Sequence, residues 1–191
     1  MQFGNSEESF CELKFERVYA TDALSNFVCG LPDIDDFIHN QFGDYICMGG
    51  CELYLVKEGD EIVAMFCLDN STLPLSEVAK EKMHDGLKPF PQHNPAPDDI
   101  YWWKCSYEAV EITYLAVAKE RRNQHIGSFI IEAIMERVAT TSDYNGDFVI
   151  VRALQCEDGY TAVPFYEKCG FFLAEERVST KNLFMYRVVM R

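Results

Sequence analysis

Apolar and polar residues alternate in the first third of the chain with the periods of strands and helices. Residues 13–19, LKFERVY, alternate between apolar and polar side chains and predict a strand. Thr21 is placed to cap a short helix that runs through Val28. Residues 32–42 carry apolar side chains at helical spacing behind Pro32, which favours a helix start. Two apolar runs, 51–57 and 61–68, flank a turn with glycine and predict a β-hairpin.

The second half of the chain shows the same alternation more sharply. Its order is strand, amphipathic helix, strand, helix and a closing hairpin, and the predicted elements span 110–118, 128–139, 147–154, 161–169 and 171–190. Gly170 is placed to end the second of these helices. The whole series predicts an α/β (α+β) fold with a mixed sheet that helices cover on both faces.

Residues 69–109 are the least regular part of the sequence. A helix is expected at 76–85, and a proline-rich stretch follows at 89–97. Irregular segments of this length inside a compact domain are typically functional. We therefore expect one domain, 1–191, in which 69–109 is an irregular insert that forms an acceptor-site loop.

An aromatic cluster, Tyr101, Trp102 and Trp103, lies near the end of this insert and follows two aspartates. Aromatic faces beside carboxylates suit a cationic amine, so these residues are candidates for substrate binding. The alternative is that they anchor the long loop to the core.

The charge of the chain limits its partners. With 17 Lys and Arg against 31 Asp and Glu, the net charge is −14 over 191 residues. Such a surface repels polyphosphate chains, which makes nucleic acid an unlikely partner. No apolar run reaches the roughly 18 residues of a membrane span, and the first residues lack a secretory pattern. We expect a cytoplasmic protein without a membrane partner, as a monomer or a homodimer.

The eight cysteines are scattered and include no CxxC pair. Cys47, Cys51 and His39 are conceivable metal ligands, but zinc sites have tighter and repeated spacing. Buried reduced thiols are the simpler interpretation, and no metal is expected.

A polar loop joins the strand at 110–118 to the following helix. The first amides of a helix have no partner within it and, with the peptide dipoles, can cradle phosphate. Gly127 has no side chain that would keep a ligand from this backbone, and Arg121 and Arg122 add positive charge. The alternative is an ordinary crossover with a solvated basic turn.

Two motifs in this half carry a family resemblance. RRNQHIG, residues 121–127, is similar to the acyl-CoA loop of the Gcn5-related N-acetyltransferase (GNAT) superfamily, Arg/Gln-x-x-Gly-x-Gly/Ala. Arg122 and Gly127 match its ends, while His125 replaces the first glycine as a loop substitution. AVPFYEKCGFF, residues 162–172, resembles the family's second segment. The resemblance implies a GNAT-type, mostly antiparallel mixed sheet and acetyl-CoA as co-substrate.

The resemblance also implies roles for individual residues. Tyr166 would protonate the departing CoA sulfur, and Glu111 would remove a proton from the amine. Main-chain groups near Leu115 and Val117 would hold the acyl carbonyl. The pyrophosphate would lie on the loop and the first turn of the helix, that is, on Arg122, Asn123, Gln124, His125, Ile126, Gly127 and Ser128.

These observations favour an N-acetyltransferase that moves an acetyl or similar acyl group from CoA to a primary amine by direct transfer in a ternary complex. The acceptor is expected to be cationic: a small amine, a polyamine or a protein amine. One alternative is an acyl-CoA sensor without catalysis. His125 leaves it open, and so does Gly159, which stands where the family commonly has an asparagine. Another is a toxin-like acetyltransferase acting on aminoacyl-tRNA, which the N-terminal half faintly resembles.

Overall fold

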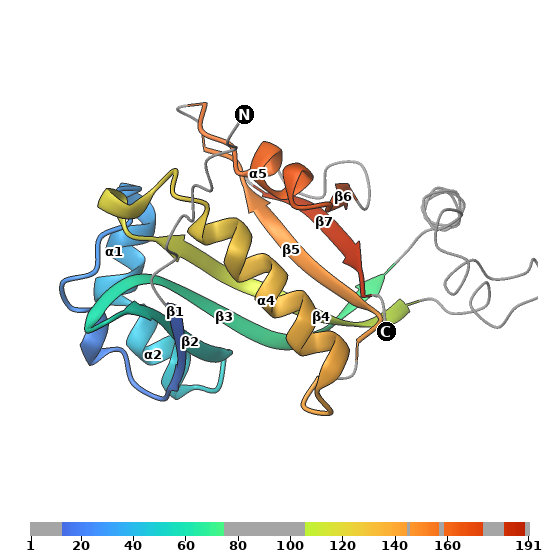
Figure 1. Ribbon diagram of the computed structural model, residues 1–191, viewed down its shortest axis with the longest axis horizontal. Helices are drawn as coiled ribbons and strands as arrows, with labels where there is room; N and C mark the ends of the chain where they lie inside the picture. The colour runs from blue at the N-terminus through green and yellow to red at the C-terminus, as the bar shows by residue number, and fades with distance from the viewer. Residues whose placement is uncertain (1–12, 75–105, 145, 157–158, 174–181, 190–191) are drawn as a thin grey trace, which may run out of the picture. The chain divides into compact units, whose positions relative to one another are not determined.

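The computed structural model describes residues 13–74, 106–144, 146–156, 159–173 and 182–189 (Figure 1). These residues form two compact units. The first contains residues 13–67 and 114–127, and the second contains 68–74, 106–113 and the described residues from Ser128 onward. Strands β3 and β4 each contribute residues to both units.

Within the described residues, a seven-stranded mixed sheet has the order β1-β2-β3-β4-β5-β7-β6. The β4–β5 pair is parallel, whereas β1–β2, β5–β7 and β6–β7 are antiparallel. This confirms the predicted mixed, mostly antiparallel sheet. The strands are β1 (Leu13–Val18), β2 (Glu52–Glu58), β3 (Glu61–Pro74), β4 (Ser106–Val117), β5 (Phe148–Leu154), β6 (Phe172–Leu173) and β7 (Asn182–Val188).

The helices predicted at 128–139 and 161–169 are confirmed with small changes in their ends, whereas the two predicted before residue 43 differ. Pro32 is the first residue of its helix, as expected, but the pattern predicted at 32–42 divides into two helices. After Thr21 only a 3-10 turn forms, and the Thr21 side chain makes no cap hydrogen bond. The helical segments are η1 (Asp22–Leu24), α1 (Pro32–Asn40), α2 (Phe42–Cys47), η4 (Lys119–Arg121), α4 (Ile126–Thr140) and α5 (Val163–Lys168).

Strands β3 and β4 extend into the segment that the sequence predicted to be irregular. Residues 69–74 continue β3, and 106–109 begin β4, so the ends of the interval 69–109 are regular. The sequence DNST at 69–72 has low β propensity, but pairing between neighbouring strands outweighs it. The helix expected at 76–85 and the aromatic residues Tyr101, Trp102 and Trp103 lie outside the described residues.

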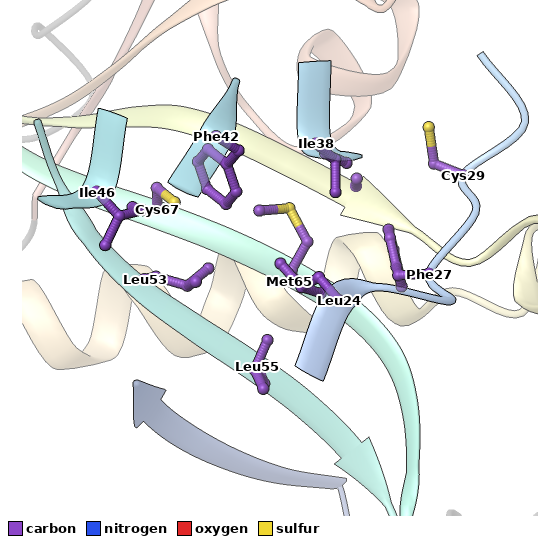
Figure 2. Close-up of a cluster of buried hydrophobic side chains, with 11 residues drawn as sticks. Leu24, Phe27, Cys29, Ile38, Phe42, Ile46, Leu53, Leu55, Met65 and Cys67 are labelled. Atoms are coloured by element: carbon purple, nitrogen blue, oxygen red, sulfur yellow. The ribbon is translucent and has the colours of Figure 1, made fainter. Parts of the chain in front are cut away.

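The core of the first unit joins the two N-terminal helices to the sheet. Figure 2 shows Phe42 and Ile38 from the helices facing Met65 and Leu53 from the strands. At its margin Tyr114 of β4 stacks on Phe37, with ring centroids 4.9 Å apart. This packing fixes the strand that leads into the polar loop.

The core of the second unit lies where β4, β5 and β7 pair. Ala109, Phe148, Ile150 and Tyr186 are buried in one cluster with Leu73 of β3. The apolar residues predicted for one side of α4 are all buried: Ile130, Ile131, Ile134 and Val138. Among the described residues, no helix is long and apolar enough to cross a membrane.

Gly146 sets how closely the chain approaches β4 just before β5 begins. A Cβ atom at this position would lie 3.0 Å from the backbone of Ala109. The adjacent Asp147 amide donates to the Glu108 carbonyl at 3.1 Å, which holds the two segments together. A side chain at 146 would therefore have to push two backbones apart.

We predict that Gly146→Ala lowers the free energy of unfolding by about 1–3 kcal/mol, the usual cost of overpacking. Urea denaturation of the purified variant measures this value. Ser142→Ala, at an exposed position after α4, is the control and should leave the midpoint nearly unchanged. Equal midpoints for both variants would contradict the close approach.

Candidate functional site

The loop between β4 and α4 is held at its start by main-chain hydrogen bonds. The Ala118 amide donates to Val63 and the Lys119 amide to Val28, both at 2.9 Å. Beyond the η4 turn, Asn123 and His125 adopt positive φ angles of 62° and 60°. Histidine tolerates the left-handed region better than most residues, and His125, which stands where the similar family loop has its first glycine, adopts it.

The amides that follow are available for a ligand. Among the described residues, the main-chain N–H groups of Asn123 through Gly127 have no acceptor. Ile126, the first residue of α4, is buried and anchors the helix start, whereas the side chains from Arg122 to His125 are exposed. The mouth of α4 thus presents unsatisfied donors next to a fixed helix end.

The two arginines of the loop have different surroundings. Arg121 forms ion pairs with Glu58 and, at 3.8 Å, with Glu61. Arg122 is exposed and has no acidic partner among the residues that the structure describes. Of these two arginines, Arg122 is therefore the one whose charge is left for an anionic ligand.

A turn from the N-terminal half packs against this loop. A Cβ atom on Gly30 would lie only 3.0 Å from Cδ of Lys119, so the Lys119 side chain packs closely against this glycine. Asp35 accepts hydrogen bonds from the amides of Cys29 and Gly30 at 2.7 and 2.9 Å, which fixes the turn. Burial raises the pKa of the neighbouring Cys29 thiol to about 11, so this cysteine stays protonated at neutral pH.

Tyr166 lies on α5 among other aromatic rings. It is 6% exposed and contacts Phe165 and Phe171 edge to face, with centroids 5.0 and 5.4 Å away. Burial, followed by the nearby Tyr160 and Cys169, raises its pKa above the ordinary tyrosine value. The phenol is consequently neutral over the physiological pH range.

The end of α5 is tied to the first turns of α4. The Cys169 thiol lies 3.8 Å from the Ser128 hydroxyl. Arg187 of β7 donates to the Cys169 carbonyl at 2.9 Å and forms a bidentate pair with Glu132 of α4 at 2.6 and 3.1 Å. Arg187 therefore fixes the helix that carries Tyr166 relative to α4.

Glu111 of β4 is held by side chains from the strands on either side. Its Oε2 accepts a hydrogen bond from Ser71 of β3 at 3.0 Å, and its Oε1 accepts one from Nε of Arg152 of β5 at 2.9 Å. The Glu111 side chain is 12% exposed. Each carboxylate oxygen has a further lone pair, so two hydrogen bonds leave it able to accept a proton.

The remaining predicted residues are found as follows. Leu115 and Val117 are half-buried residues of β4 in the first unit. No group of three metal-ligating side chains occurs within the described ranges. Cys47 is exposed and Cys51 is partly buried, and neither forms a disulfide.

Sequence reasoning missed Ser71, Arg152 and Arg187. Each contacts a residue that is distant in the chain, so no local motif identifies it. One signal was present: Arg152 is the only charged residue in the apolar strand FVIVRAL. A charge in such a strand indicates either a strand end or a specific partner.

Comparison with solved structures shows the same fold in several other proteins. A structure described as a bacterial toxin superposes with a TM-score of 0.66 at 14% identity, covering 93% of this chain and 91% of the other. AtaTR bound with acetyl-CoA gives 0.63 at 17% identity, with 93% and 94% coverage. AtaT complexed with acetyl-methionyl-tRNAfMet gives 0.61 at 17%, with 91% and 94%. The TM-scores establish a shared fold, and at these low identities the likeness shows the fold alone.

A comparison with curated proteins gives no match. Residues 97–172, however, match the family model of the acetyltransferase (GNAT) domain. The matched stretch contains β4, the polar loop, the whole of α4 and the helix of Tyr166. Residues 97–172 are therefore similar to an acetyltransferase (GNAT) domain, and the described residues have the fold of the solved structures named above.

Proposed function

We propose that this enzyme transfers the acetyl group directly to a primary amine, with Tyr166 as general acid and Glu111 as general base. The observation that carries the proposal is the run of amides without acceptors at the mouth of α4, beside an arginine without an acidic partner in the described structure. A diphosphate needs such a group of donors in a chain of net charge −14.

In this proposal the CoA diphosphate binds to the amides from Asn123 to Gly127, and Ser128 continues the donor row. The two residues with positive φ bend the backbone, and bends of this kind let successive N–H groups face one anion. Arg122 adds a charge-assisted hydrogen bond. Main-chain groups at Leu115 and Val117 would orient the acyl carbonyl.

Tyr166 would act on the sulfur. When the amine attacks the thioester, the sulfur gains negative charge as the C–S bond breaks. A neutral phenol can donate a hydrogen bond to that charge and then its proton. Because burial raises the pKa of Tyr166, the phenol stays protonated and can donate a hydrogen bond to the sulfur as its negative charge develops.

Glu111 would act on the amine. An alkylammonium has a pKa of about 10.4 in lysine-like groups and is not nucleophilic until it loses a proton. The carboxylate is oriented by Ser71 and Arg152 and can accept that proton directly or through water.

Cysteine does not suit the role of a covalent intermediate carrier. The thiolate is the reactive form of cysteine, and burial raises the pKa of Cys169 above its ordinary value. The transfer is therefore proposed as a direct attack of amine on thioester in a ternary complex. A cytoplasmic location fits these reduced thiols.

The acceptor is proposed to be a small amine, a polyamine or a protein amine. A second candidate is the α-amine of aminoacyl-tRNA, because the chain shares its fold with AtaT, which was solved with acetyl-methionyl-tRNAfMet. The excess of 31 acidic over 17 basic residues opposes binding of a large polyanion.

A panel of amines and charged tRNA separates these acceptors. We expect amine-dependent release of CoA thiol with small or protein amines and no transfer to tRNA at low salt. Transfer to aminoacyl-tRNA with an affinity that falls steeply with salt would establish the second candidate instead. Binding of acetyl-CoA without any transfer would point to a sensor.

Arg122→Gln should weaken acetyl-CoA binding about tenfold or more, since a hydrogen bond to a charged group contributes about 1.5–3 kcal/mol. Isothermal titration calorimetry measures this change. Arg137→Gln removes a half-buried arginine of α4 that pairs with Asp143 and serves as the control. Equal affinities of the two variants would exclude Arg122 from the cofactor site.

Tyr166→Phe should lower kcat by about 10²–10⁴-fold, the usual contribution of a general acid, with little change in acetyl-CoA affinity. The same variant tests the pKa. In a spectrophotometric titration the wild-type protein should show one more tyrosine ionising above the ordinary pH of about 10 than the variant does. Unchanged turnover would remove Tyr166 from the mechanism.

Glu111→Gln should lower kcat/KM at pH 7 by about 10²-fold or more. The defect should shrink as the pH approaches the pKa of the acceptor, because the amine is then already deprotonated. Ser71→Ala keeps the carboxylate and should have a smaller effect at every pH. A defect of the same size from pH 7 to pH 10 would assign Glu111 a structural role.

A further inference from the structure

One face of the sheet in the second unit changes from apolar to polar along a single line. On each of three strands, a buried member of the cluster lies two positions along the chain from a polar side chain at the margin of the cluster. The pairs are Leu73 and Ser71 on β3, Ala109 and Glu111 on β4, and Ile150 and Arg152 on β5. Residues two apart share a face, so the polar side chains form a row at the edge of this core.

The row continues to β7 through an aromatic ring. Arg152 is paired with Phe184 in the β5–β7 register, and its guanidinium lies over that ring, 5.5 Å from the centroid. On its other side, Nε of Arg152 donates to Glu111 at 2.9 Å. The guanidinium is thus held at a fixed place by a carboxylate and a ring.

The outer part of the guanidinium is open. The Arg152 side chain is 61% exposed, and within the described residues its Nη1 and Nη2 atoms make no hydrogen bond. These atoms carry most of the five N–H donors of an arginine and have the planar fork that matches a carboxylate or a phosphate. An arginine anchored through Nε alone is well arranged to bind an anion in two-point fashion.

We propose that Arg152 binds an anionic group of the acceptor, so that the substrate is an amine with a carboxylate or phosphate a few bonds from its nitrogen. This inference rests on the proposed role of Glu111. The ammonium would lie at the carboxylate of Glu111 and the anion at the Nη fork of Arg152, side by side like the two residues themselves. An amine without an anion would place its positive charge beside an unsatisfied guanidinium.

Matched pairs of acceptors test the proposal. The carboxylate arm compares an α-amino acid with its amide, and the phosphate arm compares phosphoethanolamine with ethanolamine. Thiol release gives kcat and KM for each acceptor with the wild-type enzyme and with Arg152→Gln, Arg152→Lys and Ser71→Ala.

In the wild-type enzyme, the anionic member of at least one pair should have the lower KM. Arg152→Gln should raise that KM about 10–100-fold, the range expected for a charge-assisted pair, and should leave the KM of the neutral partner unchanged. Arg152→Lys should restore part of the loss, since it keeps the charge without the fork. Ser71→Ala disturbs Glu111 alone and should change kcat rather than KM.

Two outcomes would overturn the proposal while leaving acetyl transfer intact. One is equal KM values within both pairs, and the other is an equal rise in KM for charged and neutral acceptors in Arg152→Gln. If no acceptor in the panel is acetylated, thermal shift by the same ligands gives the answer. A rise in Tm with the anionic members that Arg152→Gln abolishes supports the site, and no rise overturns it. Failure of acetyl transfer with every amine tested would count against the proposed function itself.

Discussion

The proposed cofactor site has to hold a diphosphate on a chain whose net charge repels it, and this electrostatic constraint limits how such a site can be built. Acidic residues outnumber basic ones by 31 to 17. Arg121 shows the consequence, because its charge is neutralised by Glu58 and Glu61. Main-chain amides escape this problem, since their dipoles are fixed by the backbone and point wherever the fold aims them.

In the proposed site, the backbone of the loop between β4 and α4 supplies these main-chain amides. Asn123 and His125 hold left-handed conformations that cost non-glycine residues on the order of 1 kcal/mol or more. Such conformations persist where the surroundings fix them. Here the main-chain bonds of Ala118 and Lys119 secure one end of the loop, and the buried Ile126 secures the other.

Much of the fold follows from periodicity, and the exceptions have a common cause. Amphipathic or apolar runs located β1, α1, β4, α4 and β5 to within a few residues. The helix α2 was missed as a separate element because FGDYIC is short and contains glycine, so it depends on Phe42 and Ile46 packing in the core. Likewise, β3 continues through polar residues because its neighbour in the sheet extends beside it.

The candidate residues could be named from the sequence where they belong to a local motif, whereas the residues that support them through contacts could not. Tyr166 and Glu111 stand in recognisable segments. Their supporting residues come from elsewhere: Ser71 lies 40 positions before Glu111, Arg152 lies 41 after it, and Arg187 reaches Glu132 across 55 positions. Only strand register brings such pairs together, and register is not written in the spacing of a single sequence.

The Glu111–Arg152 pair also gives a direction to the proposed reaction. A substrate with an ammonium and an anion matches both charges, whereas its acetylated product has a neutral amide and keeps only the anion. Once Glu111 has passed its proton to water, its carboxylate is negative again and lies beside that anion without a compensating ammonium. Like charges held side by side repel each other, so in this proposal the pair would bind the substrate more tightly than the product and favour release.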